Sequence, residues 1–215
     1  DVSIYEEWKV GNQNEFLCSF CTAWQLSVRS KYSSPLFLDA THNTCYVLDV
    51  KSRNDFLHTI VLRHSIAGCG VLVAFMITSS ETKLPLEQWL KWLKVKAPLT
   101  KTPTSMIDCS VTQVTGIKAA FDNPNIRFRH WLFFRALNAQ TKKIIDLVVR
   151  KFVIAEFKSL VRTKSIYEIN KYWAAYQEKY KDEEGWLNYL TFKWMSQPKR
   201  WWLGIRIVTH LFLII

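Results

Sequence analysis

The feature that most constrains the fold is a change of hydrophobic period along the chain. Three early runs, "LFLDAT", "FLHTIVLRH" and "GVLVAFMIT", are short, apolar and rich in β-forming residues, which is typical of strands. In "LPLEQWLKWLKVK" the apolar residues recur at helical spacing, with Pro85 at the start. The two periods together predict a chain that contains both strands and helices.

The order of the predicted elements gives the fold class. The three runs are expected to form an antiparallel meander, which a helix, the short strand "TSMID" and a helix over "VTQVTGIKAAF" follow. "NIRFRHWLFF" predicts a further strand that leads into a helix. After about residue 132 the chain is expected to form successive helices, the first of them over "RALNAQTKKIIDLVVRKFVIAEFKSLVRT", residues 135 to 163. Strands of mixed direction covered by helices define an α/β protein.

Composition limits the class of partner. Hydrophobic residues make up 49% of the chain, which argues against disorder. The net charge of +11 favours a polyanionic partner, with nucleic acid first and an anionic membrane second. For the ten tryptophans, core packing along helices is favoured over base stacking.

The apolar end of the chain, "WWLGIRIVTHLFLII", is not expected to anchor it in a membrane. It is 15 residues long and Arg206 and His210 interrupt it, whereas a spanning helix needs about 20 apolar residues. We expect a core segment here.

The five cysteines do not predict a disulfide framework, because their number is odd and their positions are scattered. Cys18 and Cys21 form a lone C-x-x-C pair, and a zinc site would need a second pair of ligands. Two buried thiols are therefore the preferred interpretation.

Two acids share one local pattern. Asp39 follows "LFL" and Asp108 follows "SMI", so each is expected at the end of a short apolar strand. If the two strands are neighbours, the carboxylates converge and are suited to bind divalent cations such as Mg²⁺. The spacing alone supports equally well an alternative in which both acids cap turns or helices.

The remaining acids and histidines of this region are less informative. His42 either orders the Asp39 loop, contacts a phosphate, or is an ordinary turn residue. Structural roles are expected for Asp49, Asp55, His58 and His64.

Longer stretches resemble a known family. "LFLDATHNT", "LHTIVLRHSIAGCGVLVAFMITSSETKLPLEQWLKWLK" and "SMIDCSVTQVTGIKAAF" closely resemble the transposase domain of Mutator-like elements, the MULE family, over about residues 16 to 140. The resemblance implies an RNase H-like core and a DDE-type acidic triad that binds Mg²⁺ or Mn²⁺. It also implies DNA cleavage and strand transfer, a nuclear location and possible homo-oligomers.

On this resemblance Asp39 and Asp108 match the first and second catalytic, metal-binding acids. Family members carry a C-x-x-H near the fifth strand, where this chain has Arg129 and Leu132. The residues expected to contact DNA are His42, Arg129, His130 and Arg135.

The third acid of the family has no match in this sequence. "PKRWWLGIRIVTH" resembles the approach to it, so a chain truncated before that acid, and therefore catalytically incomplete, is the expectation. Five glutamates of the C-terminal region remain unassigned: Glu156, Glu168, Glu178, Glu183 and Glu184.

The resulting expectation has three parts: an N-terminal flank over 1–35, an RNase H-like core over 36–140 with a mixed five-stranded sheet and flanking helices, and a mainly helical insertion over 141–215. Three functions stay open. The first is a DDE-type transposase-derived domain, and the second is a non-catalytic DNA-binding or assembly protein on that scaffold. The third is a basic α/β protein whose acids are structural.

Overall fold

The computed structural model describes most of the chain and divides it into two compact units. The described residues are 2–10, 13–32, 35–46, 54–63, 68–99, 103–163 and 165–201. The first unit covers residues 1–126 and the second covers 127–215. Each unit is described below by itself.

The sheet contains seven strands, so the expectation of five is wrong, whereas the α/β class is confirmed. The strands are β1 (Val2–Val10), β2 (Gln13–Cys21), β3 (Leu36–Tyr46), β4 (Asn54–Arg63), β5 (Gly70–Thr78), β6 (Thr104–Ile107) and β7 (Asn125–Phe128). They lie in the order β1-β2-β5-β4-β3-β6-β7. β3, β4 and β5 form the predicted antiparallel meander, and β6 pairs with β3 in parallel.

The two additional strands come from the first 35 residues, where β1 and β2 form an antiparallel hairpin that pairs with β5. Along most of β1, half-buried and exposed residues alternate, as in a strand with only one face covered. Its half-buried positions include Val2, Ile4 and Trp8, and its exposed positions include Glu7 and Lys9.

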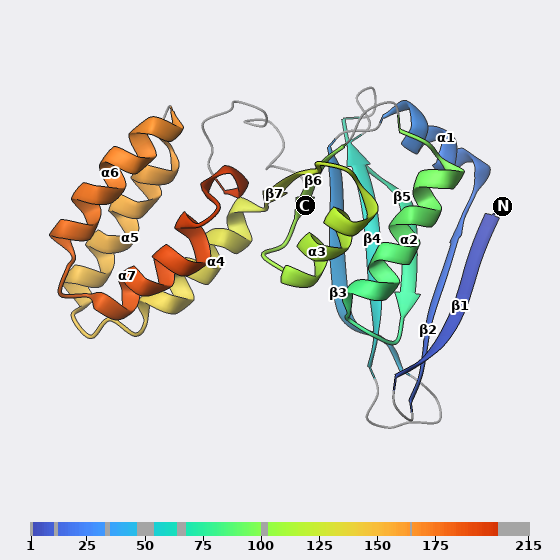
Figure 1. The fold of residues 1–215 in the computed structure, drawn as a ribbon, viewed down its shortest axis with the longest axis horizontal. Coiled ribbons are helices and arrows are strands. Elements are labelled where there is room, and N and C mark those ends of the chain that lie inside the picture. The colour runs from blue at the N-terminus through green and yellow to red at the C-terminus, as the bar shows by residue number, and fades with distance from the viewer. Residues whose placement is uncertain are drawn as a thin grey trace. The chain divides into compact units, whose positions relative to one another are not determined.

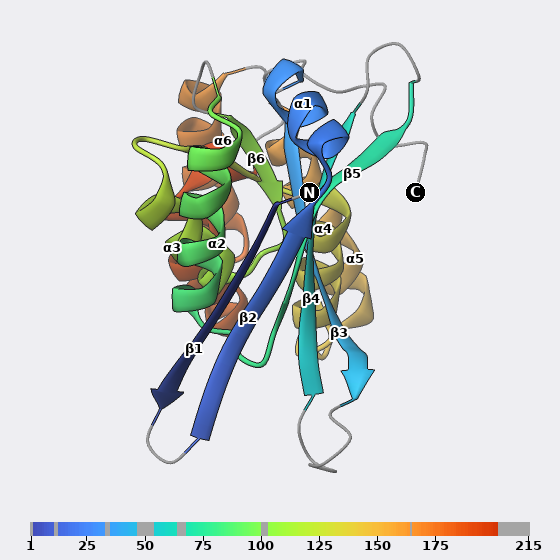
Figure 2. The same cartoon turned by 90° about the vertical axis from the view of Figure 1, so that its right-hand side faces the viewer.

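Three helices accompany the sheet in the first unit: α1 (Ala23–Lys31), α2 (Lys83–Lys96) and α3 (Val111–Ala120). In Figure 1, α2 and α3 lie side by side over one face of the sheet. Figure 2 shows the same helices to one side of the strands. α2 buries the residues that its periodicity selects: Pro85, Leu86, Trp89, Leu90 and Leu93.

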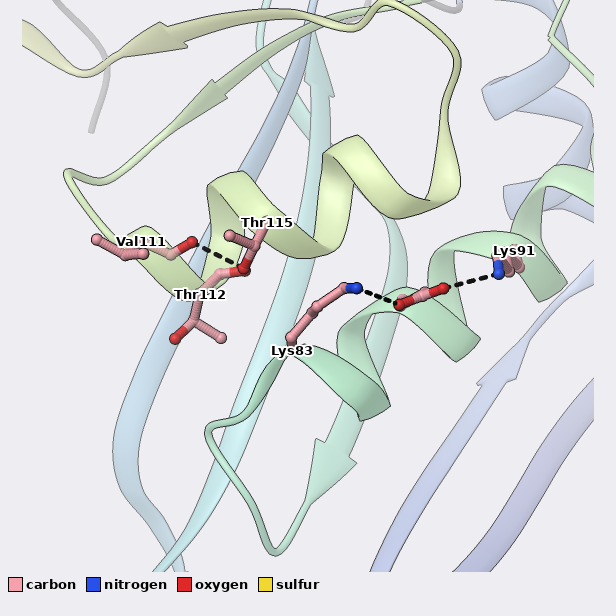
Figure 3. Close-up of polar contacts among 6 residues, drawn as sticks. Lys83, Lys91, Val111, Thr112 and Thr115 are labelled. Carbon is pink, nitrogen blue, oxygen red and sulfur yellow. Dashed lines mark hydrogen bonds and ion pairs between the residues drawn. The ribbon is translucent and has the colours of Figure 1, made fainter. Parts of the chain in front are cut away.

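Figure 3 shows polar contacts within each of these two helices. Glu87 forms ion pairs with Lys83 at 3.1 Å and Lys91 at 2.7 Å, one turn away on either side. The hydrogen bonds from Lys91 and Lys83 lower the pKa of the Glu87 carboxyl. In α3, Thr115 Oγ1 donates toward the carbonyls of Val111 and Thr112.

Buried polar contacts tie the helices to their surroundings. Trp89 Nε1 donates to Ser19 Oγ at 2.9 Å, which connects α2 to β2. Arg29 of α1 is fully buried, and its Nη1 donates to the carbonyls of Leu93 and Ala97 at the end of α2. Burial lowers the pKa of this guanidinium to about 10. Helix α2 is therefore held from both the sheet and α1.

The second unit is helical over its described part after β7, as the change of period predicts. Its helices are α4 (His130–Thr141), α5 (Leu147–Val161), α6 (Ile166–Lys179) and α7 (Glu184–Leu190), which a π-helical turn (Thr191–Met195) and a 3-10 turn (Pro198–Arg200) follow. The segment expected as one helix from about residue 135 to 163 is two. Asp146 accepts from the N–H groups of Val148 at 2.7 Å and Val149 at 3.1 Å, so it begins α5 as its N-cap.

An aromatic cluster forms the core of the second unit. Phe133 stacks on Trp201 with the ring centroids 5.6 Å apart, and it meets Trp194 edge to face at 4.6 Å. Phe157 contacts Trp186 and Trp201 from α5. Core packing is confirmed for the buried tryptophans Trp89, Trp186, Trp194 and Trp201, whereas Trp24 and Trp131 are exposed.

Among the described helices, none combines the length and apolar character that a membrane span requires. Residues 202–215, which the sequence predicts to be a core segment, lie outside the described part of the chain.

Candidate metal site

The pairing of β3 with β6 determines where the two predicted acids lie. The strands are parallel, with Leu36 opposite Ser105 and Phe37 opposite Met106. Asp39 and Asp108 each lie two residues further along, with the same separation of 69 positions. The same offset places Asp108, the first residue after β6, level with Asp39 of β3. Neighbouring strands are about 4.8 Å apart, so the two acids belong to adjoining segments of the chain.

The sequence predicts that each acid lies at the end of a strand, and this is confirmed for Asp108 and wrong for Asp39. β6 ends at Ile107, so Asp108 directly follows it. Asp39 instead lies inside β3, which continues to Tyr46 because β4 pairs with it past the acid, with Asp39 opposite Thr59. The candidate site therefore lies where β6 ends beside the middle of β3, and both acids are partly buried.

Neither acid is the N-cap residue of a described helix, whereas the other form of the structural alternative, a role in a turn, stays a prediction. The N-cap of α3 is Ser110, whose Oγ accepts from the N–H of Gln113 at 3.3 Å. The Gln113 side chain is buried and its Oε1 accepts from the backbone N–H of Asp108 at 3.2 Å. The start of α3 therefore holds the backbone of Asp108 beside β3.

Sequence reasoning missed Gln113 as a residue that positions the site. The spacing Ser110-x-x-Gln113 is that of a capping box, in which the third helical residue hydrogen-bonds back to the cap. Here the glutamine reaches two residues further, to Asp108. The motif signals the helix start, and tertiary structure decides which N–H group the side chain reaches.

Carboxylate oxygens are the ligands that Mg²⁺ and Mn²⁺ prefer, so the residues present fit such an ion. Within the described residues, no group of three or more His, Cys, Asp or Glu side chains is arranged to hold a metal. The candidate metal site consists of the two acids that the sequence indicates, Asp39 and Asp108.

The four residues expected to contact DNA are distributed over both units. The backbone of His42 lies in β3 opposite Phe56, and its side chain is outside the described part of the structure. Arg129, His130 and Arg135 belong to the second unit, at and within the start of α4.

His130 has a structural contact in the second unit. Its ring Nε2 lies 3.1 Å from the carbonyl oxygen of Trp201, which accepts the hydrogen bond. Burial lowers the pKa of the His130 imidazole, the hydrogen bond to Trp201 opposes that shift, and the charge of Arg127 adds a smaller lowering effect. Arg135 is exposed, and its guanidinium lies 5.3 Å from the centroid of the Trp131 ring.

Residues expected to be structural are largely buried where they are described. Asp55 and His58 are buried in β4. Cys21 is buried and Cys18 is partly buried in β2, and three positions of separation direct their side chains to opposite sheet faces. The pair therefore does not form half of a zinc site. Asp49 and His64 lie outside the described residues.

Comparisons of this chain with protein families and with curated proteins find no match.

Proposed function

We propose that this chain carries an RNase H-like, transposase-derived domain of the DDE type, whose chemistry is metal-dependent DNA cleavage and strand transfer. The strand order β5-β4-β3-β6-β7, an antiparallel meander followed by a parallel strand, supports an RNase H-like core. The helices between β5 and β6 and between β6 and β7 are α2 and α3, which agrees with that architecture.

The observation that carries the proposal is the position of Asp39 inside β3 and of Asp108 directly after β6, the strand that pairs with β3 in parallel. In this function the two carboxylates hold Mg²⁺ or Mn²⁺, and a bound ion of this kind activates water and stabilises a leaving phosphate oxygen. Gln113 keeps Asp108 in place through its backbone N–H. The net charge of +11 suits a DNA substrate, because phosphate contacts by Lys and Arg release counterions.

The test is a Mn²⁺ titration of the whole chain, followed by the electron paramagnetic resonance signal of the free ion. Asp39→Asn and Asp108→Asn are each expected to weaken Mn²⁺ binding by about tenfold or more, because each removes a charged ligand. Asp122→Asn is the matched control, since the Asp122 side chain is 99% exposed and pairs with the surface Lys94. Equal Mn²⁺ affinity in all four proteins would overturn the proposal.

A second candidate is a DNA-binding or assembly protein on the same scaffold that does not cleave. The distribution of charge favours it: residues 127–215 contain 17 Lys and Arg against 7 Asp and Glu, and they include neither Asp39 nor Asp108. The Mn²⁺ titration separates the two candidates, because the third acid has no match in this sequence and a lack of cleavage would fit both. Loss of Mn²⁺ affinity in Asp39→Asn supports the metal-dependent domain, whereas DNA binding with Mn²⁺ affinity unchanged in Asp39→Asn supports the second candidate.

A further inference from the structure

The positive charge of the chain is concentrated in one unit. Residues 1–126 contain 12 Lys and Arg against 11 Asp and Glu, a net charge of +1, whereas residues 127–215 have a net charge of +10. The segment 123–145, which contains α4, has five Lys and Arg and no acid. A polyanion that approaches this chain is therefore attracted chiefly to the helical unit.

One face of α4 combines these charges with an exposed aromatic ring. Trp131, Arg135, Asn138 and Lys142 follow one another at intervals of four, three and four residues, which places them along a single face of the helix. We call these four residues the α4 stripe. Each is exposed, and the Trp131 side chain is 64% exposed. At about 1.5 Å per residue the stripe is roughly 16 Å long.

The opposite face of α4 fixes the stripe in place. Phe133 and Leu137 are fully buried in the aromatic core of the unit. Arg150 of α5 donates hydrogen bonds to the carbonyls of Lys142 and Ile144, so it stabilises the backbone of the segment that follows α4. These contacts fix the backbone from which the four side chains of the stripe project.

The chemistry of the stripe fits an unpaired nucleotide strand. The guanidinium of Arg135 lies over the Trp131 ring, and a ring this exposed still offers area for a base to stack. Arg135 and Lys142 supply donors for phosphates, and the Asn138 amide supplies a polar contact between them. A base inside a duplex is already stacked, so an exposed indole favours single-stranded over double-stranded nucleic acid.

We propose that the α4 stripe binds single-stranded DNA, with Trp131 stacked on a base and with Arg135 and Lys142 on phosphates. This rests on the proposed function for the identity of the polyanion, and it adds where and in what form the DNA is held.

The experiment measures fluorescence anisotropy of a labelled 20-nucleotide single strand with the full chain, in EDTA and at several salt concentrations. Trp131→Ala is expected to weaken binding by about 5- to 150-fold, the loss of one base–aromatic stack, with little change in salt dependence. Trp131→Phe keeps a stacking surface and should retain most of the affinity. Trp24→Ala is the matched control, because Trp24 is 60% exposed and lies in the first unit.

The cationic members of the stripe are tested through the salt dependence of binding. The Arg135→Gln, Lys142→Gln pair should reduce the slope of log affinity against log salt by about 1.4, or 0.7 for each phosphate contact. Lys31→Gln, Lys96→Gln removes the same charge from the first unit, where both lysines are exposed, and should leave the slope nearly unchanged. Equal effects of the two pairs would show that net charge alone attracts DNA, and would overturn the proposal.

Two other outcomes also overturn it. One is unchanged single-strand affinity in Trp131→Ala, and the other is loss of binding to phosphatidylserine vesicles in Trp131→Ala without loss of oligonucleotide binding. EDTA removes the contribution of metal, and Asp39→Asn should bind the oligonucleotide as the wild type does. A negative result for the α4 stripe variants therefore does not change the outcome of the Mn²⁺ titration. A negative Mn²⁺ titration likewise does not change the oligonucleotide affinities measured in EDTA.

Discussion

At the scale of single residues, Gln113 connects a helix start to the candidate metal site. Gln113→Leu keeps the buried volume but leaves the N–H of Asp108 without its acceptor. We expect a loss of about 1–3 kcal/mol in the free energy of unfolding, together with weaker Mn²⁺ binding. Urea denaturation measures the first effect. The control is Gln177→Leu, which makes the same replacement at a half-buried position of α6 and should change the free energy of unfolding little. Equal stability of the two variants would contradict the role assigned to Gln113.

His130 predicts a pH dependence of stability. Burial lowers its pKa in the folded state below the ordinary value of 6.5, so as the pH falls below about 6.5 the unfolded chain takes up a proton that the folded chain does not. The contribution of His130 to stability is therefore full above that pH and is lost as the pH falls toward the lowered value. His130→Gln, which can still donate to the carbonyl of Trp201, removes this titration.

The measurement compares urea midpoints at pH 7.5 and pH 5.5. The wild type should lose more stability between the two values than His130→Gln does, since carboxylates that titrate are common to both proteins. An equal loss in the two proteins would mean that His130 is protonated equally easily in the folded and unfolded states.

At the scale of elements, the contact of α2 with α3 depends on a glycine. A Cβ at position 116 would lie 2.8 Å from Cδ2 of the fully buried Leu86 and 2.9 Å from its Cγ, so a rotation of the end of that side chain alone would not relieve the overlap. Gly116→Ala should therefore destabilise the protein by about 1–3 kcal/mol, although alanine is the better helix former by about 1 kcal/mol. The melting temperature measures the net effect.

Gly185 in α7 provides the matched control, because a Cβ there meets nothing within 4 Å. Gly185→Ala should be neutral or stabilising, by up to about 1 kcal/mol. If Gly116→Ala also stabilises, the two helices are less closely packed than described here.

Periodicity predicted the elements whose buried faces are wide. The meander, α2 and α3 agree with the sequence because each presents a continuous apolar face to the core. β1 and β2 were missed because one face of β1 is open to solvent and carries charged residues, so the pair resembles a polar flank. The division between α4 and α5 was missed because Asp146 interrupts a pattern whose apolar residues continue on both sides.

The candidate site could be predicted only in part. The residue types and their strand context indicated Asp39 and Asp108, but the register that brings them together is a tertiary property. The role of Gln113 could not be predicted for the same reason, since its hydrogen-bond partner Asp108 lies outside α3. The concentration of charge was readable from the sequence, and counting the two halves separately would have found it.

At the scale of the whole molecule, each unit has its own core, so damage to one is expected to stay there. Phe157 is fully buried among aromatic rings of the second unit, and Phe157→Ala should cost about 3–5 kcal/mol. Hydrogen exchange should then accelerate over residues 127–201 and stay unchanged over the first unit. Leu86→Ala, at about 2–5 kcal/mol, is the reciprocal variant and should affect only residues 1–126. Uniform acceleration in either variant would show a single cooperative unit.

The equal separation of the paired residues in β3 and β6 has a consequence for how such a chain tolerates change. A substitution next to either acid alters the surroundings of the carboxylates but leaves the offset between the two strands unchanged. Deletion of a single residue from "SMI" would move Asp108 into the position that Ile107 now holds at the end of β6, so it would no longer be level with Asp39. Over evolutionary time, the acid pair is therefore more vulnerable to small insertions and deletions within these two strands than to most replacements of their neighbours.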